Sequence, residues 1–211
     1  PETHPPTGCD GTMKRAIVLF LSLLAALRLT QAAPPNVVMI ISDDHAWTDY
    51  GFMGHKTVAT PNLDKLAAQS LTFPRGYVPS SLCCPSLASI ITGLYPPSTG
   101  AEHMRSLTRL PKDFGMFPQY LREAGYYCTN NNKEDYNLKK PEDLWHDSSK
   151  KAHWKNRPAG QPFFAVFNST TTHESSIRSR NHTFVHDPAK APLPKYHPDN
   201  QESRQGWAQY Y

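Results

Sequence analysis

Short apolar runs alternate along this chain with segments that have the spacing of amphipathic helices. The run NVVMII, residues 36–41, is continuous and rich in β-branched residues, which predicts a strand buried on both faces of a parallel sheet. YYCT, residues 126–129, and PFFAVFNS, residues 162–169, predict two further strands. The sequence thus spaces three strands widely enough for helices to connect them.

The segments between these runs predict helices. TPNLDKLAAQS offers Thr60 as the N-cap and Pro61 at the first helical position, and its apolar residues fall on one face: Leu63, Leu66 and Ala67. FPQYLREAGYY follows the same logic, with Gly125 as the C-terminal stop. Strand, helix and strand in this order favour an α/β fold: a doubly wound, mostly parallel sheet with helices on both faces.

The N-terminal pattern differs from the rest of the chain. A basic start, an apolar run over residues 16–27 and small residues before a cleavage point near Ala32 predict a secretory signal peptide at residues 13–32. The alternative is a buried N-terminal helix. The run is too short to span a bilayer comfortably, so we expect no membrane span. Residues 1–12 are then translated upstream sequence without a role, and residues 33–211 form an exported protein, periplasmic or secreted.

Composition narrows the function only slightly. A formal net charge of +4 over 211 residues is weakly basic, and no basic stripe interleaved with aromatic residues predicts a nucleic-acid partner. Beyond the predicted leader the chain keeps three cysteines: Cys83, Cys84 and Cys128. An odd number in an exported protein leaves one thiol unpaired, or one that is no longer a thiol.

Two adjacent carboxylates, Asp43 and Asp44, follow the first predicted strand directly. Ligands of open α/β sheets bind outside the carboxyl ends of the strands. Adjacent carboxylates repel each other and are costly to hold together unless a cation is bound beside them. The alternative is a solvated turn that caps a helix.

The stretch PSSLCCPSLASIITG places Cys83 beside a predicted helix N-terminus, because Pro85 fits a first helical turn and Gly93 a helix end. The free N–H groups and the dipole there favour an anion, which lowers a thiol pKa and could hold a tetrahedral oxyanion. The alternatives are a buried structural cysteine or half of a disulfide, for example Cys84 with Cys128. Adjacent cysteines do not match zinc-site spacing.

CCPSLASIITG resembles the sulfatase signature, which reads Cys, any residue, Pro, Ser, Arg, and then several residues to Thr-Gly. Six further segments resemble sulfatase segments in the same order: IISDDHAWTDYG, TPNLDKLAAQSLTF, GLYPPSTG, FPQYLREAGYY, NNNKEDYN and FFAVFNSTTTHES. Several ordered matches are far more specific than one motif. The details CCPS, NNKEDYN and THES look closest to the heparan N-sulfatase (N-sulfoglucosamine sulfohydrolase) branch.

The resemblance implies the N-terminal part of an alkaline-phosphatase-like domain and a defined chemistry. A formylglycine-generating enzyme would oxidise Cys83 to formylglycine, whose hydrated form attacks the sulfur of a sulfate ester or sulfamate, as found in sulfated carbohydrate. Asp43, Asp44 and the modified position 83 would bind one calcium ion. Lys133 would bind the sulfate oxygens or the diol, and His173 would assist the leaving group.

Two departures from the family pattern matter. Leu87 stands where the signature has arginine, and leucine cannot donate that residue's charge-assisted hydrogen bonds, each contributing about 1.5 to 3 kcal/mol. The chain also ends in ESRQGWAQYY, the start of a predicted helix, so we expect part of a longer gene whose second pair of calcium ligands and a further lysine lie downstream. Two rival classes stay open: a phosphatase or phosphonate hydrolase on the same scaffold, and an inactive glycan-binding relative.

Overall fold

A computed structural model describes residues 15, 17–18, 33–179 and 183–211. The predicted leader and the residues before it lie outside this range, apart from Arg15, Ile17 and Val18. The chain divides into the units Pro1–Pro35 and Asn36–Tyr211, and all four strands belong to the second. Among the described residues, none of the helices is both long and apolar enough to cross a membrane.

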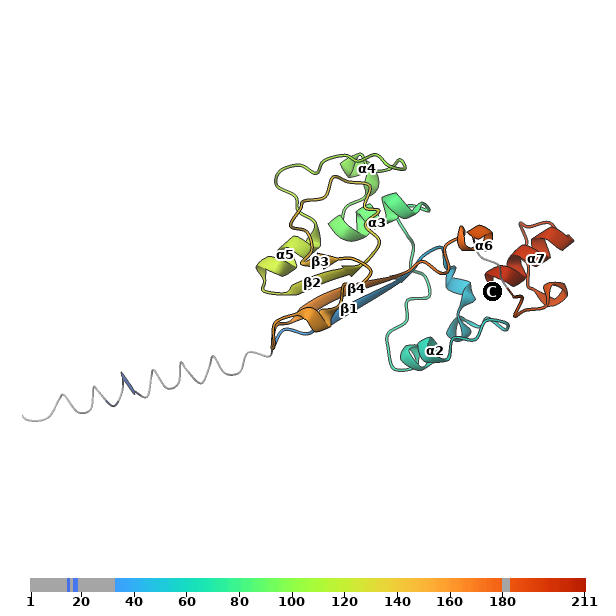
Figure 1. Ribbon diagram of the computed structural model, residues 1–211, viewed down its shortest axis with the longest axis horizontal. Helices are drawn as coiled ribbons and strands as arrows, with labels where there is room; N and C mark the ends of the chain where they lie inside the picture. Colours follow the sequence, from blue (N-terminus) through green and yellow to red (C-terminus); the bar gives the residue numbers. More distant parts are fainter. Residues whose placement is uncertain (1–14, 16, 19–32, 180–182) are drawn as a thin grey trace, which may run out of the picture. The chain divides into compact units, whose positions relative to one another are not determined.

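The second unit contains a four-stranded sheet in the order β1-β4-β2-β3, with every pair parallel (Figure 1). The strands are β1 (Val37–Ser42), β2 (Tyr127–Asn131), β3 (Asp147–Ser148) and β4 (Phe163–Ser169). The three predicted strands are therefore confirmed, and the two-residue β3 is added. Parallel neighbours need crossover connections; helices lie between β1 and β2 in the chain, whereas β2 and β3 are joined by a loop. The predicted α/β class with a parallel sheet is confirmed.

The prediction that the first strand is buried on both faces is wrong. Val38 and Ile40 are 48% and 65% exposed, whereas Met39 and Ile41 on the opposite face pack against the core. The core cluster packs against only the face of β1 that carries Met39 and Ile41, and β1 is an edge strand, paired only with β4. Consecutive buried residues are found instead in the inner strands, at Phe163–Val166 in β4 and Cys128–Asn130 in β2.

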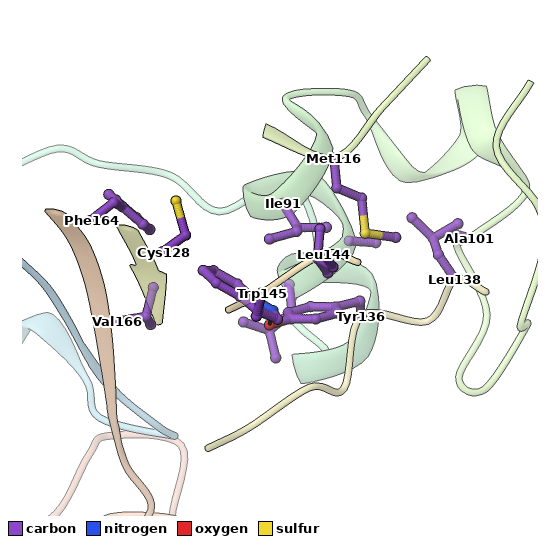
Figure 2. Packing of buried hydrophobic residues seen from close by; sticks show 12 residues of the cluster. Ile91, Ala101, Met116, Cys128, Tyr136, Leu138, Leu144, Trp145, Phe164 and Val166 are labelled. Atoms are coloured by element: carbon purple, nitrogen blue, oxygen red, sulfur yellow. Dashed lines mark hydrogen bonds between the residues drawn. The ribbon is translucent and has the colours of Figure 1, made fainter. Parts of the chain in front are cut away.

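Helices α3 (Cys83–Thr92) and α5 (Phe117–Glu123) cover one face of the sheet and enclose the core. Both end as predicted at glycines in the left-handed region, Gly93 at φ +71° and Gly125 at φ +88°. Figure 2 shows the cluster between them, where the indole N–H of Trp145 donates to the Tyr136 hydroxyl at 3.1 Å. The buried members of this core are Leu87, Ala88, Ile91, Ala101, Met116, Cys128, Tyr136, Leu138, Leu144, Trp145, Phe164 and Val166.

The other elements are short helices and turns around the sheet. The α-helices are α2 (Pro61–Ala67), α4 (Pro96–Thr99), α6 (Ser176–Ser179) and α7 (Gln201–Tyr210), and the 3-10 turns are η1 (Trp47–Asp49), η2 (Gly51–Met53), η3 (Trp154–Asn156) and η4 (Pro188–Lys190). On the second face of the sheet, Trp154 of η3 stacks on Phe163 and meets Phe167 edge-on.

Helix α2 begins where the sequence predicts, with Thr60 at the N-cap and Pro61 at the first position. The Thr60 hydroxyl, however, donates to Asp64 Oδ1 at 2.7 Å and accepts the N–H of Gly51 at 2.8 Å, which ties the helix to the preceding loop. Its apolar face lines an open groove of about 360 Å³. The apolar side chains of this groove are Trp47, Tyr50, Phe52, Met53, Leu63, Leu66, Ala67, Leu71 and Phe73.

We predict that the 211-residue chain binds a hydrophobic fluorescent dye, because Leu71 and Phe73 are 79% and 75% exposed beside this apolar groove. The double variant Leu71→Ser, Phe73→Ser should lower the dye fluorescence. Tyr196→Ser is the matched control, since Tyr196 is equally exposed but is not part of the groove. Equal fluorescence from the double variant and the control would contradict the assignment of the dye site.

Candidate active site

Three loops leave the carboxyl ends of neighbouring strands and meet at one edge of the sheet. Asp43 and Asp44 follow β1, Lys133 follows β2, and His173 follows β4. Since β4 lies between β1 and β2, parallel pairing brings these three chain positions to the same edge. This is the edge where the sequence predicted a ligand site.

Asp43 and Lys133 form an ion pair at the centre of this edge. Lys133 Nζ lies 2.6 Å from Asp43 Oδ2, with the two side chains only 16% and 11% exposed. Two hydrogen bonds hold the backbone of Asp43. Its N–H donates to Ser169 O at 3.0 Å, and the Thr172 hydroxyl donates to Asp43 O at 2.5 Å. The pair is thus fixed between the ends of all three loops.

The electrostatics of Lys133 connect this pair to the cysteine segment. Burial lowers the pKa of Lys133, but the hydrogen bond and the charge of Asp43, followed by the charges of Cys83 and Asp135, outweigh that effect and leave the pKa raised. Lys133 therefore stays cationic among three anionic or potentially anionic groups.

Asp44 and His173 lie beside the ion pair. Asp44 adopts a left-handed backbone conformation, φ +51°, which aspartate tolerates better than most residues. Its Oδ2 accepts the N–H of Glu174 at 3.1 Å and lies 3.6 Å from His173 Nε2. The other ring nitrogen of His173 is 2.8 Å from the Ser175 hydroxyl. The β4 loop thus places an imidazole against the second carboxylate.

Cys83 is the first residue of α3, as the position of Pro85 predicted. Leu82 is the extended N-cap, and it offers no side-chain capping bond. The Cys83 thiol instead lies 3.6 Å from Asp135 Oδ2. Asp135 belongs to the same loop as Lys133. The structure therefore brings Cys83, Lys133 and Asp43 into one connected group and sets Asp44 with His173 next to it.

The Cys84–Cys128 disulfide left open by the sequence is not formed, since Cys83, Cys84 and Cys128 are all free thiols. Cys84 and Cys128 are fully buried. Burial, followed by the interactions with Asp135 and Cys83, raises the pKa of Cys84 to about 12. Burial raises the pKa of Cys128 to about 11, against a smaller opposing effect of Arg122.

Sequence reasoning missed two residues of this site. Asp135 lies two positions after Lys133 in NNNKEDYN, and its acidic character was a signal that could have found it. Asn130 is buried at the end of β2, and its amide donates to Lys133 O at 3.1 Å and to the Ser148 hydroxyl at 3.0 Å. A second amide, that of Asn168 in β4, donates to Asn130 Oδ1 at 2.9 Å. These bonds fix the loop on which Lys133 sits.

Leu87 lies one helical turn after Cys83 and belongs to the hydrophobic core. It lines a cavity of about 20 Å³ together with Ile41, Asn130 and Lys133. The sulfatase signature has a charged arginine at this position, whereas this chain has a leucine side chain packed in the core. Lys133 faces this region without a second cation from α3.

One group of potential metal ligands lies at this edge and contains two carboxylates and an imidazole. Asp43, Asp44 and His173 each offer a ligand atom, and these atoms lie within 4.8 Å of one another. The two carboxylates have the oxygen ligands that calcium prefers. They fall short of the six to eight oxygens of a full calcium shell, so these residues fit one side of such a site.

Comparisons with known proteins identify the family of this chain. A family model described as Sulfatase matches residues 35–140, which is half of the chain. The chain belongs to the sulfatase family. The sulfatase segment contains Asp43, Asp44, Cys83 and Lys133, whereas His173 follows it.

Individual sulfatases extend the match beyond this segment. An ulvan-active sulfatase from Formosa agariphila is 46% identical over 155 residues, covering 68% of this chain and 26% of its own length. An N-acetylgalactosamine-6-sulfatase from Rattus norvegicus is 37% identical over 134 residues, covering 57% of this chain and 25% of its own length. The chain thus spans about a quarter of the length of these curated relatives.

A solved structure of a 2-O GAG sulfatase matches with a TM-score of 0.57 and 20% identity, covering 79% of this chain and 41% of the other. This likeness supports the α/β fold with a parallel sheet. The comparisons establish the sulfatase family, and the assignment to its heparan N-sulfatase branch stays a prediction.

We predict that Lys133→Met lowers the free energy of unfolding by roughly 1 to 3 kcal/mol at neutral pH, because it leaves a nearly buried Asp43 carboxylate without its partner. The folded-state pKa of Lys133 lies above its ordinary value of 10.5. The stability from this pair is therefore fully present below 10.5 and is lost as pH rises through the folded-state pKa. Urea unfolding of wild type and variant across this range measures the difference.

Lys140→Met is the matched control, since Lys140 pairs with Glu134 on a more exposed surface and should cost at most about 1 kcal/mol. A difference between wild type and Lys133→Met that stays constant well above pH 10.5 would contradict the buried-pair interpretation.

Proposed function

We propose that this chain supplies the nucleophile-bearing part of a sulfatase that hydrolyses sulfate esters or sulfamates of sulfated carbohydrate. One observation carries the proposal: the ion pair of Asp43 with Lys133 joins the carboxylates after β1 to Cys83 at the start of α3, within the segment that matches the family. A buried cation beside a modifiable nucleophile is suited to an anionic substrate.

Cys83 is the proposed nucleophile position. After oxidation to formylglycine by a formylglycine-generating enzyme, the hydrated side chain would present an oxygen at the N-terminal end of α3. The first N–H groups of a helix are free to donate, so they favour the negative charge that develops on sulfate oxygens during attack. Lys133 adds a full positive charge from the β2 loop, held in place by Asp43.

His173 is the proposed proton donor to the leaving group. Its Nε2 lies 3.6 Å from Asp44 Oδ2 and its Nδ1 lies 2.8 Å from the Ser175 hydroxyl, so contacts on both nitrogens orient the ring. The side chain is about a third exposed, so it can reach an incoming substrate. Protonation of the departing oxygen or nitrogen would remove the charge that otherwise forms on it.

Asp43 and Asp44 are the proposed calcium ligands, together with the modified position 83. Bound there, calcium would neutralise the charge of the sulfate group. The Glu174 N–H and the Thr172 hydroxyl orient the two aspartates through Asp44 Oδ2 and Asp43 O, and so prearrange the carboxylates.

The substrate class rests on the relatives. At 37 to 46% identity these relatives are an N-acetylgalactosamine-6-sulfatase and an ulvan-active sulfatase, which supports a sulfated carbohydrate here. Export follows from the predicted signal peptide at residues 13–32. The family match does not favour the phosphatase or phosphonate hydrolase alternative. Leu87 keeps an inactive glycan-binding relative as the second candidate, and the state of Cys83 separates the two.

We predict low conversion of Cys83 to formylglycine when the chain is expressed with the maturing enzyme, and higher conversion after Leu87→Arg. Each charge-assisted bond contributes about 1.5 to 3 kcal/mol, so restoring one should raise the conversion rate about tenfold or more. Peptide mass spectrometry reads the modification directly. Leu87→Met is the control that keeps the apolar contact, and complete conversion with Leu87 in place would refute this account of the arginine.

We also predict that the 211-residue chain, with Cys83 converted and calcium added, shows no turnover of an aryl sulfate. Asp43, Asp44 and position 83 provide only part of a shell of six to eight oxygens, and the loss of one donor to a developing oxyanion typically costs about 2.7 to 4 kcal/mol. Asp44→Ala serves as the blank. Turnover that disappears in Asp44→Ala would show that the described residues form a complete site and would overturn the ligand count.

A further inference from the structure

A second group of potential metal ligands lies on the other side of Lys133. The sulfur atoms of Cys83 and Cys84 and a carboxylate oxygen of Asp135 lie within 4.8 Å of one another. Cys84 is fully buried, and Cys83 and Asp135 are partly buried. The cysteines come from the first turn of α3, and Asp135 lies 52 positions after Cys83, in the loop that follows β2.

We propose that the chain binds one zinc ion through Cys83, Cys84 and Asp135 as long as Cys83 is an unmodified thiol. The consequence for maturation rests on the function proposed above: zinc would hold the thiol that the maturing enzyme must oxidise. Conversion of Cys83 removes a sulfur ligand, so the zinc-bound and the converted forms exclude each other.

One edge of the group has the length expected for tetrahedral zinc, and all three ligand atoms lie within 4.8 Å of one another. With Zn–S near 2.3 Å and Zn–O near 2.1 Å, a tetrahedral sulfur-to-oxygen edge is about 3.6 Å. The Cys83 Sγ to Asp135 Oδ2 distance is 3.6 Å. Three protein ligands leave the fourth position for water, which is a recurrent arrangement in zinc proteins. The adjacent cysteines alone lack zinc-site spacing, and the third ligand is supplied by the fold.

The charges of the group also fit. Two thiolates and a carboxylate carry three negative charges, of which zinc neutralises two. Lys133, whose charge interacts with both Cys83 and Asp135, offsets the third, and the N-terminal end of α3 favours the anionic sulfurs. Both cysteines would bind zinc as thiolates, so zinc binding should weaken as the pH falls.

Ligand softness separates this site from the calcium ligands. Thiolates select zinc over calcium, whereas the carboxylates of Asp43 and Asp44 are hard donors. The two groups share Lys133 as a neighbour but share no ligand while Cys83 is a thiol. Calcium in excess should therefore leave zinc binding unchanged.

The test uses the 211-residue chain with Cys83 verified as unmodified by mass spectrometry. Cobalt titration should give the intense visible bands of a tetrahedral site and a thiolate charge-transfer band, at one ion per chain. Competition with a chromophoric zinc chelator then gives the affinity. Cys84→Ser and Asp135→Asn should each weaken zinc binding by at least about 100-fold, more than typical outer-shell substitutions.

Two control variants complete the design. Cys128→Ser removes a buried thiol outside the group, and Asp44→Asn removes a ligand of the neighbouring group, so both should bind zinc like wild type. Circular dichroism checks that Cys84→Ser is folded, and Asp135→Asn carries the test if it is not. Absence of the charge-transfer band in wild type, or unchanged affinity in Asp135→Asn, would overturn the proposal.

Alkylation of Cys83 distinguishes this proposal from the proposed function. Zinc should slow alkylation of Cys83 in wild type but not in Asp135→Asn, as read by peptide mass spectrometry. Conversion of Cys83 without zinc, combined with no zinc protection, would refute the zinc site and leave the proposed function standing. Zinc protection of Cys83, combined with no conversion to formylglycine in any variant, would support the zinc site and refute the proposed function.

Discussion

Parallel pairing of β1 and β2 with opposite edges of β4 is the constraint on which the site depends. It pairs Ser42 with Ser169 and Asn131 with Phe167, so that segments 130 positions apart in the chain leave the sheet at the same edge. The ladder continues into the site itself, because Asp43 N–H donates to Ser169 O. The first carboxylate is therefore placed by a sheet hydrogen bond and not by a flexible loop.

Asparagines at this edge take over where regular pairing stops. Asn168 bonds Asn130, and Asn130 bonds the backbone of Lys133 and the Ser148 hydroxyl, so the ends of β4, β2 and β3 are joined through side-chain amides. A buried amide without partners is costly, and a satisfied one fixes its neighbours. The backbone position of Lys133 is thus fixed to the strands through the side chains of Asn130 and Asn168.

The sequence was sufficient for elements whose signal is local. Short apolar runs located three of the four strands, and Pro61, Gly93 and Gly125 located helix ends, because these depend on neighbouring residues only. The exposure of Val38 and Ile40 could not be read from their own run, since it depends on which elements pack against that face of β1. Asp135 and Asn130 were missed for a related reason: their role comes from partners, 52 positions away for Asp135 and 38 for Asn130.

Lys133 interacts electrostatically with members of both candidate metal groups, Asp43–Asp44–His173 and Cys83–Cys84–Asp135. On one side it pairs with Asp43 at 2.6 Å, and on the other its charge meets those of Cys83 and Asp135. Burial lowers its pKa, but the hydrogen bond and charge of Asp43 and the charges of Cys83 and Asp135 outweigh that effect and raise it, so the ammonium is linked electrostatically to both groups. Loss of the Cys83 sulfur would leave Asp135 facing Lys133 without the neighbouring thiol, while the contacts of Asp43 and Asp44 would be untouched. Modification of one atom at the start of α3 would then shift the site from sulfur to oxygen ligands without moving the sheet.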